Sequence, residues 1–259
     1  MSVPVGFDYV LILEWLAKGD ARTGEQLHEF LQSIGFRSEL VVCHSWENIE
    51  QVLTSARIAA DAKGVPIVHL ETHGANPWAA GADEIGFGPF PDSAPAWSTF
   101  GAILAPLNVR AGFRLLVVSA ACWGSGIIAA IDAGDHPAPF ACAVGLRTEV
   151  TEGAVRACMR ELYRRLRDGS TLEESVASAQ RELRAGQELR LEIIVDLAAG
   201  MLATLFRRRR VWLVGPLRWR RRARLVWDSW FPRDLQEHVP AYRFENVDQF
   251  ATAPPPEPR

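Results

Sequence analysis

Two short apolar segments, each ending in a chemically useful side chain, constrain the possible folds of this chain most strongly. The first, Val65–Thr72, runs into His73 and Gly74, and the second, Leu115–Ala121, runs into Cys122. Aliphatic and β-branched residues bounded by glycine are typical of buried strands in a parallel sheet. Ligands bind outside the carboxyl ends of the strands in open sheets of this kind. The pattern therefore predicts that an imidazole and a thiol lie at one reactive edge of a sheet.

The rest of the chain alternates expected strands with expected helices. Further strands are expected over residues 8–15, 38–43 and 140–146, and helices over residues 23–34, 45–62, 99–107, 126–133, 151–169 and 170–183. A late helical stretch is expected over Leu191–Phe206, and residues 75–100 have the composition of a long loop. This alternation predicts an α/β fold, a three-layer α/β/α sandwich with a mainly parallel sheet.

The length and charge distribution suggest one large domain with additions. The chain has 259 residues, of which 48% are hydrophobic and 23% are charged. We expect that domain over residues 1–206, an Arg- and Trp-rich addition over 207–250 packed on it, and a disordered tail over 251–259. The net charge is only −3, yet nine arginines and no acidic residue lie between Arg207 and Arg224.

Such a basic, tryptophan-containing run is able to contact nucleic acid or anionic lipid. A single basic run rarely suffices for binding nucleic acid. We therefore consider nucleic acid an unlikely partner and favour docking of this segment on the acidic remainder of the chain or on a partner protein.

The cysteines and the N-terminal residues indicate the compartment. The four cysteines form no CxxC pair, and the first residues lack the basic and apolar regions of a signal peptide. A cytoplasmic protein with reduced thiols is the natural expectation. Leu191–Phe206 is too short for a transmembrane segment and contains two acidic residues. Neither GxxxxGK[ST] nor GxGxxG is present, so we expect no nucleotide and no other cofactor.

The pair of Cys122 and His73 has the chemistry that acyl transfer needs. A thiolate attacks a carbonyl carbon, and a neighbouring imidazole deprotonates the thiol and later protonates the leaving amine. A buried structural thiol and a strand-end histidine bonded to backbone are the alternatives. We assign that structural role outright to Cys43, Cys142 and Cys158.

A zinc site is a weaker alternative at the first strand. His69, Glu71 and His73 alternate along the expected strand and share one face, which keeps a metal-dependent hydrolase open as a hypothesis. The spacing is HxExH rather than the helical HExxH of zinc proteases, and the preceding proline and valines oppose a helix. Glu71 is also a candidate for orienting His73, but two positions along a strand is a long reach.

The order and spacing of these motifs resemble the caspase-like cysteine proteases. A strand ending in His-Gly stands about 50 residues before a strand ending in Cys122 and a small turn, which reads CWGSG here. The downstream run VGLRTEVTEGA, followed by LY and then DGST, is similar to the bacterial CHAT branch of that family, and the likeness covers roughly residues 8–185. Ala120 stands where caspases have glutamine and metacaspases have aspartate, so neither relative predicts the specificity pocket.

The resemblance implies a cysteine endopeptidase that cleaves a protein substrate. In such proteins the amides of the residues that match Gly74 and Cys122 form an oxyanion hole. The loop after the next strand lines the pocket for the residue before the cut, which implies substrate-binding roles for Leu146, Arg147 and Glu149. Glu149 favours a basic substrate residue and Arg147 an acidic one, and we expect a basic or apolar residue.

The resemblance also implies regulation. Bacterial relatives often work in defence or signalling systems and stay inactive until a sensor or regulatory partner docks. The loop Asp132–Pro139 is too short for a cleavable linker, so the protein is expected to work as one uncut chain. The competing hypothesis is a pseudoprotease whose Arg- and Trp-rich end binds nucleic acid or a membrane. Salt-sensitive nucleic-acid binding without thiol reactivity would favour it.

Overall fold

The computed structural model describes residues 7–75, 86–89, 95–112, 114–128, 130 and 138–193. The chain divides into two compact units, Met1–Ile194 and Val195–Arg259, and all described residues belong to the first. The expected addition over 207–250, the expected tail over 251–259 and most of the Asp132–Pro139 loop therefore lie outside the described residues.

A six-stranded sheet in the order β2-β1-β3-β4-β5-β6 forms the centre of the first unit. The first five strands in this order are parallel, and β6 runs antiparallel to β5. The expected mainly parallel sheet is thereby confirmed. The strand bounds are β1 Tyr9–Trp15, β2 Ser38–Val42, β3 Pro66–Thr72, β4 Leu116–Ser119, β5 Cys142–Leu146 and β6 Leu189–Ile193.

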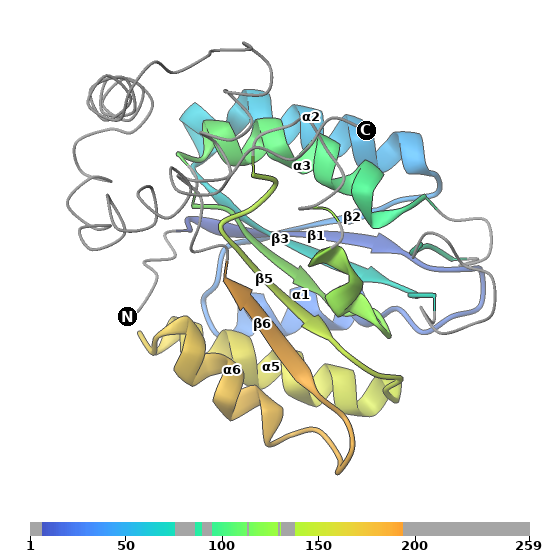
Figure 1. The fold of residues 1–259 in the computed structure, drawn as a ribbon. Coiled ribbons are helices and arrows are strands. Elements are labelled where there is room, and N and C mark those ends of the chain that lie inside the picture. The colour runs from blue at the N-terminus through green and yellow to red at the C-terminus, as the bar shows by residue number, and fades with distance from the viewer. Residues whose placement is uncertain are drawn as a thin grey trace, which may run out of the picture. The chain divides into compact units, whose positions relative to one another are not determined.

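Helices cover both faces of the sheet and complete the expected three layers (Figure 1). On one face lie α2 and α3, and on the other lie α1, α5 and α6 (Figure 1). The helix bounds are α1 Thr23–Ser33, α2 Trp46–Lys63, α3 Trp97–Arg110, α5 Glu152–Arg167 and α6 Leu172–Gln180, and a short 3-10 helix, η2, spans Gly124–Ile128. The α/β class expected from the sequence is therefore confirmed.

Local sequence signals account for the ends of several helices. Ser45 caps α2 by accepting a hydrogen bond from the amide of Asn48, and Gly64 ends that helix with a φ of 90°. Thr171 and Glu174 form a reciprocal capping box at the start of α6. Such caps satisfy backbone amides that have no partner inside the helix, so short helices begin at defined residues.

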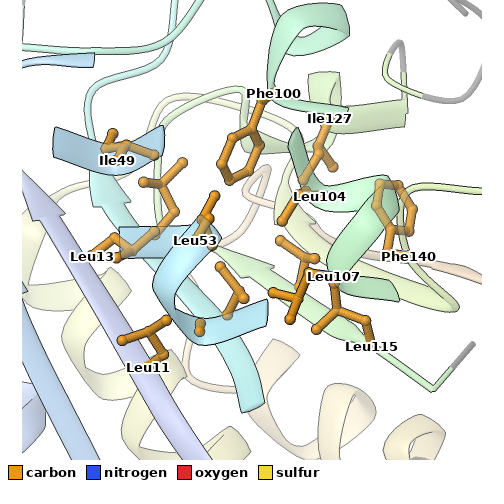
Figure 2. Packing of buried hydrophobic residues seen from close by; sticks show 14 of the residues in the cluster. Leu11, Leu13, Ile49, Leu53, Phe100, Leu104, Leu107, Leu115, Ile127 and Phe140 are labelled. Carbon is orange, nitrogen blue, oxygen red and sulfur yellow. The ribbon is translucent and has the colours of Figure 1, made fainter. Parts of the chain in front are cut away.

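The central strands are buried because apolar side chains project from both of their faces. Every residue of β1 and of β3 is buried. One large cluster fills the space between the sheet and the helices α2 and α3 (Figure 2). The figure labels Leu11, Leu13, Ile49, Leu53, Phe100, Leu104, Leu107, Leu115, Ile127 and Phe140 in this cluster. Burying each such side chain contributes about 1.5–3 kcal/mol before the cost of ordering the chain.

Part of the long loop expected over 75–100 packs into this core. Phe87 is fully buried and stacks on Trp97 with ring centroids 4.2 Å apart. Phe87 also forms an antiparallel bridge with Gly74, just beyond the end of β3. Aromatic burial therefore anchors the segment that faces Gly74.

Two expected helices differ from the structure. The helical stretch expected from Leu191 begins instead as the last residues of β6, which pair with β5. The backbone N–H and C=O groups along this edge of β5 bond to β6. This pairing depends on a distant part of the chain, so it overrides the local preference of these residues for a helix. The helix expected over 126–133 is represented among the described residues by η2 and the helical Ala130. No helix among the described residues is long and apolar enough to cross a membrane.

Candidate active site

The ends of two neighbouring parallel strands bring His73 and Cys122 together. β3 and β4 pair in register up to Leu70 and Ser119, and both candidate residues follow shortly after these positions. The two side chains line the same cavity, which has a volume of about 200 Å³. The remaining described residues that line it are Leu16, Asp20, Ala21, Thr23, Glu71, Thr72, Ala120, Val150, Glu152 and Val155.

The two turns that carry these residues touch through their backbones. A Cβ atom built on Gly74 would lie 1.8 Å from the carbonyl oxygen of Cys122, far inside van der Waals contact. Glycine is therefore required at this position, because only a residue without a side chain permits this approach. The glycine that follows His73 sets the distance between the two halves of the site.

Two amide groups are left unpaired where the turns meet. The bridge between Gly74 and Phe87 uses the amides of the neighbouring residues Ala75 and Gly88. Among the described residues, the amides of Gly74 and Cys122 have no hydrogen-bond partner. Unpaired amides beside a nucleophile are the donors that an oxyanion hole requires. The role expected for these two amides stays a prediction, and the absence of another partner leaves both amides available for it.

A strained residue shapes the turn after the thiol. Trp123 has a φ of 56°, the one positive value among described residues other than glycine. This conformation costs about 1–3 kcal/mol for a residue with a side chain. Its amide bonds to the carbonyl of Thr148, while the Cys122 thiol donates to the carbonyl of Val150 at 3.7 Å. The segment after β5 therefore holds both residues of the turn.

Asp20 is a partner of His73 that sequence reasoning missed. Its Oδ2 lies 2.8 Å from Nε2 of His73 and also accepts a hydrogen bond from the amide of Ala17. The hydrogen bond from His73 is the main reason why the pKa of Asp20 lies below its usual value. The sequence signal was weak: Asp20 and the flexible Gly19 follow β1, whose carboxyl end lies beside that of β3.

Glu71 does not bind His73, because its carboxylate oxygens are bonded to His69 and Thr23 instead. Oε1 of Glu71 lies 2.9 Å from Nε2 of His69, and Oε2 accepts a hydrogen bond from the Thr23 hydroxyl at 2.8 Å. Nδ1 of His69 lies 2.8 Å from the hydroxyl of Tyr163. Both ring nitrogens of His69, a fully buried side chain, are therefore engaged within the protein.

This buried network bears on the zinc hypothesis for His69, Glu71 and His73. His69 has no free nitrogen for a metal, and His73 is bonded to Asp20 instead. No group of three or more histidine, cysteine, aspartate or glutamate side chains among the described residues is arranged to hold a metal ion. Two separate sets of hydrogen bonds explain why these residues alternate along the strand. His69 and Glu71 belong to a buried network with Tyr163, and His73 pairs with Asp20.

The three residues expected to bind substrate do not line the cavity. Leu146 is fully buried in β5, so its side chain faces the core. Arg147 is exposed and forms an ion pair with Glu188 at 3.0 Å, and Glu149 is also exposed. From this loop it is Val150 that reaches the cavity, followed by Glu152 at the start of α5. The exact side-chain directions of a loop after a strand are not encoded in strand periodicity.

The other three cysteines lie in the core. Cys43, Cys142 and Cys158 are buried and form no disulfide, whereas Cys122 is partly exposed. Burial disfavours the charged thiolate and raises the pKa of Cys43 to about 11 and those of Cys142 and Cys158 to about 12. Only Cys122 among the four thiols is accessible to a substrate.

Comparison with known proteins adds no assignment to this site. No protein-family model matches the chain, and no curated protein matches it significantly.

Proposed function

We propose that this protein is a caspase-like cysteine endopeptidase of the CHAT type, with Cys122 as the nucleophile and His73 as the general base. The observation that carries the proposal is the cavity that a partly exposed thiol and an imidazole bonded to Asp20 line together, next to two turns with unpaired amides. Nucleophile, base, a residue that orients the base and oxyanion donors are the parts that covalent acyl transfer requires.

The hydrogen bond to Asp20 determines which ring nitrogen of His73 is free to accept a proton. Asp20 holds Nε2 of His73, so Nδ1 takes the proton of the thiol. The Cys122 sulfur then forms a bond to the carbonyl carbon of a peptide, and the amides of Gly74 and Cys122 stabilise the oxyanion. The imidazolium gives its proton to the leaving amine as the C–N bond breaks. Water then hydrolyses the thioester, with His73 taking its proton and returning one to the sulfur.

The hydrogen bond of the Cys122 thiol supports the proposal that the enzyme is regulated. Cys122 donates to the carbonyl of Val150, and a carbonyl oxygen repels the thiolate that the reaction needs. Activation therefore has to turn the sulfur from Val150 towards His73. We propose that a regulatory partner causes this change by shifting the segment after β5. The competing binding-module hypothesis depends on residues outside the described part of the chain, so no observation favours it here.

Proteome-wide identification of new N-termini tests the proposal. The full chain, with cellular extract as the source of activator and substrate, should release peptides that the Cys122→Ala variant does not release. Iodoacetamide labelling at pH 8 gives a readout independent of turnover. A pKa of about 11 leaves roughly one Cys43 thiol in a thousand ionised at this pH, so Cys122 should be labelled first. Release of the same peptides by Cys122→Ala would overturn the proposal.

A further inference from the structure

The cavity at Cys122 carries more acidic than basic groups. Asp20, Glu71 and Glu152 line it, and His73 is the one basic side chain among the described lining residues. Asp20 and His73 are bonded to each other, so the imidazolium formed during catalysis is balanced by Asp20. The charges of Glu71 and Glu152 remain to be balanced.

The hydrogen bonds around Glu71 do not cancel its charge. Burial and the nearby Glu71 raise the pKa of Tyr163 well above its usual value, so its hydroxyl keeps its proton. The chain of bonds is satisfied when that hydroxyl donates to Nδ1 of His69 and Nε2–H of the neutral imidazole donates to Glu71. The Thr23 hydroxyl donates to the other carboxylate oxygen. In this arrangement each donor is neutral, so the bonds bring no positive charge beside the Glu71 carboxylate.

Glu152 is the acidic group of the cavity with no partner. It is the first residue of α5, and its exposed side chain makes no hydrogen bond or ion pair with the described residues. The N-terminal end of a helix is a favourable place for a carboxylate, and Glu152 stands there beside the cavity. Its oxygens are therefore available for a cation that enters from solvent.

The size and walls of the cavity restrict the ligand further. About 200 Å³ is below the range of roughly 300–1,000 Å³ typical of small-molecule and cofactor sites, so the cavity suits one long side chain. Its apolar walls come from Leu16, Ala21, Ala120, Val150 and Val155. An aliphatic stem that ends in a cation matches apolar walls with carboxylates beside them.

We infer that this cavity is the specificity pocket for an arginine or lysine side chain of a protein substrate. The inference rests on the proposed endopeptidase, because the cavity contains Cys122 and the bound residue is then the one that supplies the scissile carbonyl. Glu152 contacts the cationic head, and Glu71 adds negative potential. This assigns the preference to groups of the cavity rather than to Glu149.

A pair of matched peptides tests the preference. One peptide carries arginine before the cut and the other carries citrulline, which has the same shape without the charge. The wild-type chain, activated as above, should show a kcat/KM at least about 100-fold higher for arginine, and Glu152→Gln should reduce that ratio about 10-fold. Glu25→Gln is the matched control, because Glu25 is an exposed acid in the first turn of α1 that does not line the cavity. It should leave the ratio unchanged.

A binding assay separates the two proposals. Pentylguanidine should slow iodoacetamide labelling of Cys122 several-fold in the wild type and not in Glu152→Gln, and neutral pentylurea should have no effect. Peptide cleavage without charge preference would overturn the basic pocket and leave the endopeptidase standing. Protection by pentylguanidine with no cleavage of any peptide would retain the cation site and overturn the endopeptidase. Absence of both protection and charge preference overturns the inference.

Discussion

The cluster around Glu161 on α5 and the cavity at Cys122 are both polar, but only the first is complete within the protein. Oε1 of Glu161 accepts hydrogen bonds from Ser178 at 2.6 Å and Arg165 at 2.8 Å, and Oε2 bonds to Arg164. These bonds hold the pKa of Glu161 below its usual value, with the Ser178 bond as the largest cause. Both carboxylate oxygens have partners, so the cluster needs no ligand to explain it.

The cavity leaves comparable groups without partners. Among the described residues these are the amides of Gly74 and Cys122, the hydroxyl of Thr72 and the carboxylate of Glu152. Unpaired polar groups lower the stability of a fold unless something else binds them. We therefore expect substitutions in the Glu161 cluster to change only the stability of the fold, and substitutions at the cavity to change the cleavage activity.

The largest expected effect is on the pair of Cys122 and His73. Cys122→Ala should abolish peptide cleavage while the unfolding midpoint changes little, and His73→Ala should lose nearly as much. The double variant should be little worse than either, because each residue acts only with the other. Steady-state cleavage and urea unfolding of the three variants measure this. Additive losses would show that the two residues do not act as a unit.

The next effect is expected at Gly74. An alanine there would place its Cβ 1.8 Å from the Cys122 carbonyl oxygen, so the two turns must separate and displace the Gly74 amide. Loss of one oxyanion donor lowers kcat by about 10²–10³. Gly153→Ala is the matched control, since a Cβ there meets nothing within 4 Å. Equal cleavage rates for the two variants would remove Gly74 from the site.

A smaller effect is expected at Asp20, which positions His73 through a hydrogen bond to Nε2. Asp20→Asn should lower kcat about 10- to 100-fold, because an amide holds the imidazole less well and does not balance its positive charge. KM should change little, and Asp20→Glu should recover part of the rate. A rise in KM with unchanged kcat would instead place Asp20 in substrate binding.

The smallest effect on activity is expected at Glu161, the contrasting cluster. Glu161→Gln should leave kcat/KM unchanged and destabilise the protein by about 1–2 kcal/mol at pH 7, since its arginine partners are half exposed. The lowered pKa means that the carboxylate contributes stability above its unfolded pKa near 4.5, which is lost as pH falls through the folded value. The gap between wild type and variant should therefore close in acid. Urea unfolding at pH 7 and pH 3 measures it.

Local sequence patterns were sufficient for most of the fold. The largely apolar runs of β1 and β3 predict central strands because a strand covered by helices on both faces buries side chains in both directions. The helices expected from residues 45 and 170 begin after Ser45 and Thr171, whose hydroxyls satisfy local amides. The carboxyl ends of parallel strands share an edge, so the meeting of His73 and Cys122 was also predictable. These inferences depend on neighbours in sequence or on a general rule of topology.

The tertiary structure alone decided which distant groups complete the site. Asp20 reaches His73 from the loop after β1, and Glu152 reaches the cavity from the start of α5, although local sequence indicates neither contact. Pairing with β5 likewise makes Leu191–Ile193, which were expected to begin a helix, the last residues of β6. These contacts have the same physical cause, because strand order and side-chain direction determine all of them. Both are fixed only when the whole sheet and its helices pack together.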